Sequence, residues 1–334
     1  MAANTDVVQD VLGRFRGAVL ADAGLQDVLQ AFGDRDAFIR HALVLADSCG
    51  LRLEPEDLRR ALRDDPLGIA RWSAAAPSDA VPQAGWLPVN VLPVQGELCV
   101  DWAYFGPRAL DDPFYEDSVR RALSRPLNRL MRHRSRLSDL PGLPARPPRG
   151  FIFHMSRCGS TLVSRMLAGD PRNVVISEAA PIDAVVRLDT GGDGPLHAAL
   201  LTAMVGALGR RRMPEQAHCF VKLDSWHTIA LPLFRRAFPD VPWVFLYREP
   251  GAVLASQMNQ RGIQTVPEYL PPSLFGLAPG DTRSPEDYCA RVLARTCEAV
   301  LAPFAQGRGL LVNYDQLPDA LWTAIPAAFR GCPQ

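Results

Sequence analysis

The sequence predicts an α/β protein, with a parallel sheet flanked by helices and a small all-helical domain ahead of it. From residue 150 onward, short apolar runs rich in β-branched and aromatic residues alternate with segments of helical spacing, which is typical of parallel βαβ units. Residues 5 to 72, by contrast, show helical spacing throughout. With 334 residues, 48% of them hydrophobic, the chain can bury one sizeable core and a smaller second unit.

Two Pro- and Ala-rich stretches divide the chain. Residues 73 to 85 and 138 to 150 neither continue a helix nor pair well in a sheet, so they are expected to be linkers. The sequence therefore predicts three parts: a helical domain at 1–72, a connecting strand and helix region at 86–137, and an α/β domain at 148–334.

The overall composition narrows the classes of function. The 36 basic residues balance 36 acidic ones, so no net positive field favours nucleic acid. No apolar run approaches the roughly 20 residues of a membrane span, and the N-terminus lacks the basic and apolar regions of a signal peptide, so a cytoplasmic location is expected. The seven cysteines are scattered singly, without the spacing of a zinc site or a disulfide framework, and are expected to be reduced thiols.

The first part shows amphipathic helical patterns. Apolar residues recur at spacings of three and four, and the last helix is expected to begin at Glu54, before Pro55. The segments LQDVLQAF, FIRHALVLADSCG and LEPEDLRRAL follow one another as in the Nif11-like domain, which this part resembles. In that family the module serves as a leader or docking unit, so the resemblance implies a peptide or protein partner. The alternative is a helical cap that only solubilises the rest of the chain.

The middle part is expected to hold two short strands, WLPVNVLPV and ELCVDWAYFG, and then a helical stretch that starts at Asp112 and Pro113. An aromatic cluster either forms core or lines an acceptor pocket; its members are Trp86, Trp102, Tyr104, Phe105, Phe114 and Tyr115. A local basic run is expected to be a solvated helix end, with an anion contact as the alternative; it comprises Arg132, His133, Arg134 and Arg136.

A phosphate-binding loop is expected within residues 150 to 167, GFIFHMSRCGSTLVSRML. An apolar strand leads through SRCGS into a helix, whose N-terminus offers free backbone N–H groups and the positive end of the helix dipole. Gly159 allows close approach of the backbone, and Ser160 and Thr161 add hydroxyl donors. In the loop of nucleotide triphosphatases a lysine stands where this chain has Ser160, whereas here the cation is Arg157, ahead of the glycine.

This arrangement resembles the 5′-phosphosulfate loop of sulfotransferases that use 3′-phosphoadenosine 5′-phosphosulfate (PAPS). In that loop a lysine or arginine precedes a small residue, a glycine and two hydroxyl residues; the matching positions here are Arg157, Cys158, Gly159, Ser160 and Thr161. The resemblance implies a P-loop-type, sulfotransferase-like sheet, PAPS as the co-substrate and no metal. Sulfuryl transfer moves a less charged group than phosphoryl transfer and can rely on side-chain cations.

A second element, VPWVFLYREPGAVLASQM at residues 241 to 258, extends the resemblance. An apolar strand ends at Arg248, and the helix that follows places Ser256 eight residues later. In the sulfotransferases an arginine and a serine so placed bind the 3′-phosphate of the cofactor. Such an arginine makes a bidentate charged contact, and the serine offers a short donor from the helix. The resemblance therefore assigns 3′-phosphate binding to Arg248 and Ser256.

Transfer to a hydroxyl requires a base for its proton and cations for the charge that develops on the bridging oxygen. Two further apolar strands end at Glu178 and at Lys222, with Asp224 and His227 after the second, and the carboxyl ends of parallel strands meet at one edge. By resemblance to the tyrosylprotein and heparan-type branches, Glu178 is the first candidate for the base and Lys222 is the cation. The small cytosolic branch has a histidine where this sequence has Asp224, so Asp224 and His227 remain candidates.

Each of these candidates also has a structural alternative. Glu178 would cap a helix, Asp224 would hold Lys222 in place, and His227 would be a core residue.

The C-terminal part continues the pattern. Residues 259–281 are Pro- and Gly-rich and are expected to form a lid or acceptor loop, with Arg261 either reaching the cofactor or lying at the surface. A helix is expected from Ser284, and then a buried strand, GLLVNYDQL, whose end resembles the family's Y-E-x-L element. The late R-K-G loop of the small cytosolic branch is not visible before the chain stops at FRGCPQ.

The predicted function is transfer of the sulfuryl group of PAPS to a hydroxyl acceptor, a small molecule or a peptide, by a cytoplasmic enzyme with no nucleic-acid or membrane partner. One rival is a magnesium-dependent P-loop kinase with Glu178 or Asp224 as metal ligand, which the missing loop lysine disfavours. The other is a catalytically silent module that binds a peptide or protein. The combination of Arg157, Arg248 and Ser256 disfavours it, because a silent scaffold needs none of them.

Overall fold

A computed structural model describes residues 2–63, 81–143, 146–192, 194–278, 280 and 284–330, with the backbone alone for 2–10. The chain divides into two compact units, one comprising Met1–Arg108 and Asp117–Leu140 and the other Ala109–Glu116 and Pro141–Gln334. The helical and connecting parts thus share one unit. The predicted boundary at residue 72 lies outside the described residues, and so does most of the first predicted linker.

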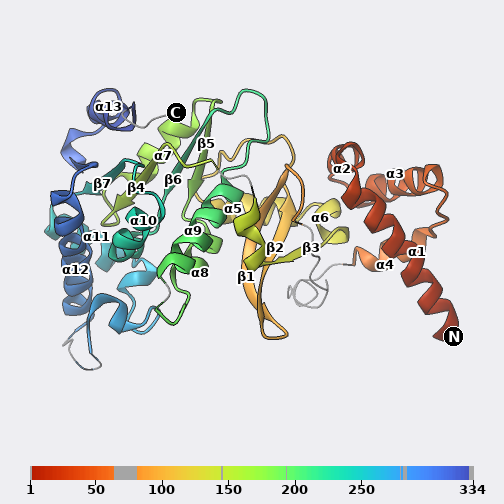
Figure 1. The fold of residues 1–334 in the computed structure, drawn as a ribbon, viewed down its shortest axis with the longest axis horizontal. Coiled ribbons are helices and arrows are strands. Elements are labelled where there is room, and N and C mark those ends of the chain that lie inside the picture. Colours follow the sequence, from red (N-terminus) through yellow and green to blue (C-terminus); the bar gives the residue numbers. More distant parts are fainter. Residues whose placement is uncertain are drawn as a thin grey trace. The chain divides into compact units, whose positions relative to one another are not determined.

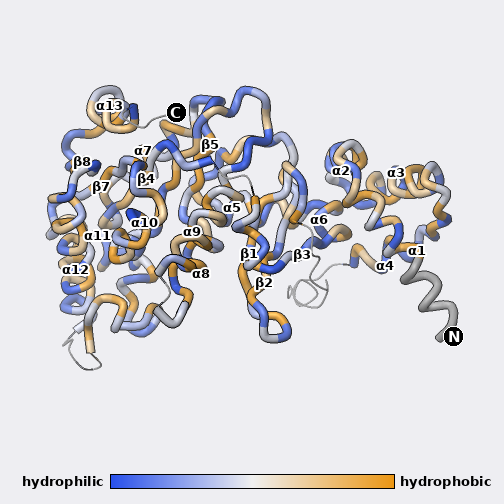
Figure 2. Tube along the Cα trace, viewed as in Figure 1, coloured by the Kyte–Doolittle hydropathy of each residue, from blue (hydrophilic) through white to orange (hydrophobic). Residues whose placement is uncertain are grey.

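The N-terminal helices are those that the periodicity predicts: α1 (Ala2–Ala21), α2 (Ala23–Gln30), α3 (Arg35–Ser48) and α4 (Pro55–Ala61). Aspartate side chains cap the second and third helices by accepting backbone N–H bonds, and the fourth begins at Pro55 after Glu54. Orange apolar residues are interleaved with blue or pale ones along α3 in Figure 2, as expected of an amphipathic helix. The resemblance to the Nif11-like domain stays a prediction.

The same unit holds an antiparallel sheet of β1 (Trp86–Val94), β2 (Glu97–Tyr104) and β3 (His133–Arg136), together with α6 (Pro126–Leu130). Two elements cross a boundary between the units in the sequence. They are α5 (Tyr115–Leu123), whose first two residues belong to the second unit, and η2 (Leu137–Gly142), whose last two residues do. Most of the aromatic cluster is core; Trp86, Trp102, Tyr104, Phe105 and Tyr115 are all buried.

The expectation of a solvated helix end at the basic run is wrong. Residues His133–Arg136 form an edge strand paired with β2, in which Arg134 lies opposite Asp101. The buried Arg134 donates from Nε to Asp101 Oδ1 at 2.6 Å, so this charge belongs to a structural ion pair.

The second unit is built on a five-stranded parallel sheet, drawn with its flanking helices in Figure 1. Its strands are β4 (Gly150–His154), β5 (Asn173–Ser177), β6 (His218–Lys222), β7 (Trp243–Tyr247) and β8 (Gly309–Asn313), in the order β5-β6-β4-β7-β8. Their near-continuous apolar runs suit a sheet covered on both faces. The predicted α/β class, with helices ahead of a parallel sheet, is confirmed.

The helices of this unit are α7 (Ser160–Ala168), α8 (Ala180–Val186), α9 (Gly194–Leu208), α10 (Leu231–Ala237), α11 (Pro250–Asn259), α12 (Pro285–Ala305) and α13 (Ala324–Arg330). Short 3₁₀ turns lie between them: η3 (Ser225–Ala230), η4 (Ile263–Thr265), η5 (Pro272–Phe275), η6 (Tyr314–Gln316) and η7 (Asp319–Leu321). In the part of the chain that the structure describes, no helix combines the length and apolar character needed to cross a membrane.

Strand β4 lies at the centre of the sheet, with β5 and β6 on one side of it and the later strands β7 and β8 on the other. This reversal of strand order is a topological switch point, and ligands of open α/β sheets bind beside it, at the carboxyl ends of the strands. An aromatic core supports the centre: the Phe153 ring makes edge contacts with Phe234 and Trp243, at centroid distances of 5.4 and 6.2 Å. The fold therefore delivers the residues that follow all five strands to one edge above a rigid core.

Candidate functional site

The loop between β4 and α7 has the backbone of an anion cradle. Ser156, Arg157 and Gly159 adopt left-handed conformations, with φ of 74°, 51° and 84°. Such backbone is costly for residues other than glycine and points successive N–H groups into a concavity. The left-handed backbone favours glycine at position 159, and a Cβ there would lie 2.8 Å from Leu317 Cδ1, so that side chain would have to shift. The predicted strand, loop and helix are present.

The loop side chains have distinct surroundings. Cys158 is buried and donates from Sγ to the carbonyl of Leu246 at 3.1 Å, and burial raises the pKa of its thiol to about 12. It is therefore a neutral packing residue. Arg157 is half-buried and donates to the carbonyl of Gln260 at 2.6 Å, so its guanidinium is held near the end of α11. Ser160 is buried at the first position of α7.

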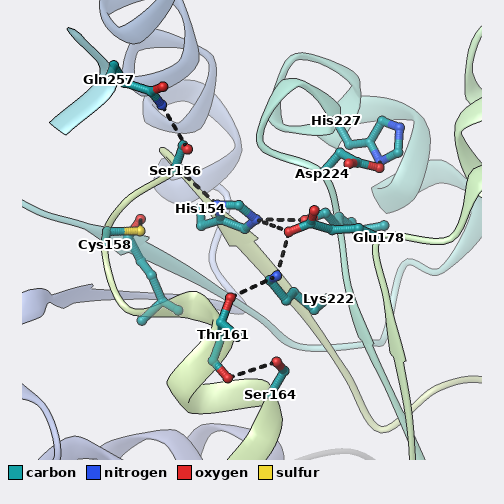
Figure 3. A network of polar contacts seen from close by, with 12 residues as sticks. His154, Ser156, Cys158, Thr161, Ser164, Glu178, Lys222, Asp224, His227 and Gln257 are labelled. Atoms are coloured by element: carbon teal, nitrogen blue, oxygen red, sulfur yellow. Dashed lines mark hydrogen bonds and ion pairs between the residues drawn. The ribbon is translucent and has the colours of Figure 1, made fainter. Parts of the chain in front are cut away.

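Glu178 and Lys222 form the centre of the site, as Figure 3 shows. Lys222 Nζ lies 2.5 Å from Glu178 Oε1 and 3.4 Å from Thr161 Oγ1 at the start of α7. The ring of Phe114, itself 39% exposed, lies over the same ammonium with its centroid 4.8 Å away. A buried lysine thus stands between a carboxylate and the hydroxyl side of the loop.

Glu178 is held in an uncommon conformation at the end of β5, with φ of 53°. The N-cap of the following helix α8 is Ala179, and the Glu178 side chain turns to Lys222 instead of capping. Burial alone would raise the pKa of Glu178, but His154 and Lys222 outweigh it and lower the pKa to about 2. The carboxylate is therefore ionised at neutral pH.

His154 is a member of the site that the sequence analysis missed. It ends β4, is buried, and places Nε2 3.4 Å from Glu178 Oε1. A histidine directly ahead of the phosphate loop was the available signal, but within an apolar run it was indistinguishable from a strand residue.

Asp224 and His227 lie next to this centre (Figure 3). Asp224 directly precedes η3, and His227 lies within it. His227 is buried, with Nε2 3.0 Å from Asp183 Oδ1 and Nδ1 3.7 Å from Asp224 Oδ2. The indole of Trp226 donates to the same Asp183 oxygen at 2.8 Å. Asp183, on α8, was also missed; it anchors the side chains of η3. Burial raises the pKa of Asp224 to about 7, against the opposing effect of His227.

Replacing Asp224 with asparagine is expected to stabilise the protein at high pH. The folded-state pKa of about 7 exceeds the ordinary 3.8, so the folded state keeps a proton that the unfolded state loses. The wild type therefore loses stability as pH rises from about 4 through 7, whereas the variant does not. We expect the melting temperature of Asp224→Asn, relative to wild type, to rise by about 5 °C between pH 4 and pH 8. A difference that stays constant with pH would contradict the buried, proton-holding state of Asp224.

The second element surrounds the neighbouring strand end. Arg248 follows β7, and its guanidinium stacks on the ring of Tyr314, 4.4 Å from the centroid. Ser256 is half-buried on α11, whose first turn is capped by the Glu249 side chain. Arg261 makes a contact within its own segment, donating to the carbonyl of Thr265 at 3.5 Å. The arginine and the serine thus follow β7 next to the loop after β4.

The segment expected to be a lid or acceptor loop packs into a cluster of its own. Leu270, Phe275 and Leu277 are buried against Trp226 of η3 and Tyr288 of α12. Parts of the segment, residues 279 and 281, lie outside the described residues. Its role as a lid or acceptor loop stays a prediction.

Within the described residues, no group of three or more His, Cys, Asp or Glu side chains is arranged to hold a metal ion. Lys222 forms its ion pair with Glu178. The structural alternative in which Asp224 holds Lys222 in place is therefore wrong. The arrangement combines a loop for an anion, a lysine beside it and one carboxylate, Glu178, in contact with that lysine.

Comparison with known proteins gives a likeness in fold only. No family model and no curated protein matches the chain. Thirteen chains of solved structures match it, among them the sulfotransferase domain from the curacin biosynthetic pathway. The identity to that domain is 19% and the TM-score 0.39, over 57% of this chain and 76% of the domain. At this distance the match carries no conclusion about activity.

Proposed function

We propose that the protein is a sulfotransferase, which moves the sulfuryl group of PAPS to a hydroxyl acceptor. One observation carries the proposal: the left-handed loop at the start of α7 lies beside a buried lysine, which is paired with a carboxylate and lies 3.4 Å from Thr161. An anion in the loop would lie next to a cation that stabilises a leaving oxygen and a base that accepts a proton. The sulfotransferase resemblance of the same residues supports this assignment.

In the proposed complex, the loop N–H groups and the hydroxyls of Ser160 and Thr161 hold the 5′-phosphosulfate, with Arg157 as an additional cation. Arg248 and Ser256 hold the 3′-phosphate. The two sets of residues follow adjacent strands, β4 and β7, at the same edge of the sheet. Charge-assisted bonds to a phosphate are among the stronger polar contacts in proteins.

The transfer itself needs one bond made and one broken at sulfur. The acceptor oxygen attacks, the bond from sulfur to the bridging oxygen of the donor breaks, and the products are a sulfate ester and 3′-phosphoadenosine 5′-phosphate (PAP). Lys222 stabilises the charge that develops on the bridging oxygen. Glu178 accepts the proton of the acceptor hydroxyl. Once Lys222 turns toward the donor, Glu178 loses the cation that lowers its pKa and becomes a stronger base.

The rival functions make different demands on the same residues. A magnesium-dependent kinase uses a loop lysine on its phosphates, where this chain has Ser160. A silent binding module would have no use for a lysine and a glutamate buried together beside the loop, an arrangement that is costly to maintain. A small-molecule or peptide hydroxyl as the acceptor, a peptide or protein partner for the helical part, and a cytoplasmic location complete the proposal.

Arg248→Ala tests the cofactor part of the proposal. The variant is expected to bind PAP more weakly by about 1.5–3 kcal/mol, because one charged hydrogen-bonding group to the 3′-phosphate is lost. Arg295→Ala is the matched control, since Arg295 is an exposed arginine on α12 that pairs with Glu298. Calorimetric titration with PAP measures both. Equal affinities of Arg248→Ala and wild type would refute the 3′-phosphate assignment.

A further inference from the structure

His154 is a buried histidine, only 5% exposed, that connects the phosphate loop to Glu178. Its Nδ1 accepts the backbone N–H of Ser156 at 3.0 Å, and its Nε2 donates to the carbonyl of Leu223 at 2.8 Å. The same Nε2 lies 3.4 Å from Glu178 Oε1. One ring therefore contacts the loop, the residue after β6 and the candidate base; Figure 3 shows it between Ser156 and Glu178.

These contacts determine the protonation state of the ring. Since Nδ1 accepts an N–H, it carries no proton, and the single ring proton is on Nε2. Burial lowers the pKa of His154, and so does the Lys222 ammonium, while Glu178 opposes them. A second proton on Nδ1 would face the Ser156 N–H and break that bond. The ring is thus neutral, and its single N–H bonds the Leu223 carbonyl at 2.8 Å while also facing Glu178 Oε1 at 3.4 Å from the same nitrogen, as in a shared, three-centre bond.

The loop side of the connection is equally constrained. Ser156 has left-handed backbone, and its Oγ accepts a hydrogen bond from Gln257 Nε2 at 3.0 Å. The Gln257 side chain is buried and accepts the N–H of Gly262 at 2.7 Å. Ser156 is held from both sides, so the ring of His154 is part of what keeps the loop in its anion-binding shape.

We propose that His154 is a positioning residue that couples the shape of the phosphate loop to the orientation of Glu178. The proposal rests on the proposed function. Lys222 donates to Oε1 of Glu178 at 2.5 Å, and the shared N–H of His154 faces the same oxygen at 3.4 Å. When Lys222 turns toward the sulfuryl group, the Nε2–H of His154 remains to keep the carboxylate in place. His154 itself touches neither donor nor acceptor.

Two substitutions separate the two ends of the ring. His154→Asn keeps an acceptor near the position of Nδ1 and loses the Nε2–H. We expect PAP affinity within about 2-fold of wild type, a roughly 10-fold lower kcat, and an acid limb of the pH profile moved to higher pH, because the pKa of Glu178 rises. His154→Gln keeps a donor near the position of Nε2 and loses the loop acceptor. We expect PAP affinity about 10-fold weaker and an unmoved acid limb.

The readouts are calorimetric titration with PAP and cleavage of ³⁵S-labelled PAPS with 4-nitrophenol as a test acceptor, between pH 3 and pH 9. His197→Asn is the matched control, a half-buried histidine whose ring bonds the carbonyl of Val185. Equal losses of affinity and kcat in both variants, with an unmoved acid limb, would show a merely structural role. Failure of the wild type to bind PAP would instead defeat the proposed function.

If the variants do not fold, the protonation of the His154 ring can be measured in the wild-type protein instead. Nitrogen NMR of the ¹⁵N-histidine-labelled protein is expected to show His154 with a protonated Nε2 and an accepting Nδ1 from pH 5 to pH 8, with and without PAP. A doubly protonated ring, or a proton on Nδ1, would overturn the proposal.

Discussion

Glu178→Gln is expected to lower the rate of sulfuryl transfer by about 10²–10⁴-fold, the range that general bases contribute, while leaving PAP affinity unchanged. Glutamine has nearly the same shape, so it still accepts a hydrogen bond from Lys222, but it cannot take up the acceptor proton. Single-turnover transfer from labelled PAPS measures the rate, and calorimetry measures the binding.

Asp224→Asn is the matched control for this prediction. Asp224 is a second buried carboxyl beside the same lysine, and its pKa of about 7 suits a base near neutrality. We expect its substitution to lower the rate by less than about 10-fold, because Glu178, not Asp224, is in contact with Lys222. Retained transfer in Glu178→Gln together with lost transfer in Asp224→Asn would move the base to Asp224.

Lys222→Met is expected to remove transfer and to destabilise the fold by about 3 kcal/mol, because it leaves a largely buried carboxylate without its cation. Lys222 is 1% exposed and the Glu178 side chain 22%, so water replaces little of the lost contact. The rate falls for a different reason: no cation remains to stabilise the bridging oxygen. Denaturant unfolding and single-turnover transfer measure the two effects separately.

The double variant Lys222→Met with Glu178→Gln distinguishes these effects. With both charges removed, we expect most of the lost stability to return, since a neutral pair has no unpaired charge to desolvate. Transfer is expected to stay absent. Stability that does not return would show that the buried ammonium is needed for packing, and recovered transfer would exclude both residues from the chemistry.

The sheet and the loop were predictable because their signals are local. The strands from β4 to β8 are short apolar runs, and the loop before Thr161 contains the glycine that its left-handed backbone requires. That the strand ends meet at one edge then follows from parallel βαβ connections. This part of the candidate site could be predicted from the sequence alone.

The contacts that were missed depend on register and tertiary packing. Arg134 resembles a solvated helix residue until β3 is placed beside β2, where Asp101 lies opposite it. His154 is one polar residue in an apolar strand, and only the position of β5 brings Glu178 to its ring. Asp183 meets His227 across 44 residues. Such pairings have no signal in spacing along the chain.

The most direct test of the proposed function is calorimetric titration of the protein with PAP, compared with ATP in the presence and absence of magnesium. We predict metal-independent binding of PAP that is tighter than binding of either form of ATP, because Arg248 and Ser256 recognise a 3′-phosphate that ATP lacks. Preference for magnesium-ATP would contradict the sulfotransferase assignment in favour of a kinase, and binding of neither nucleotide would favour the silent module.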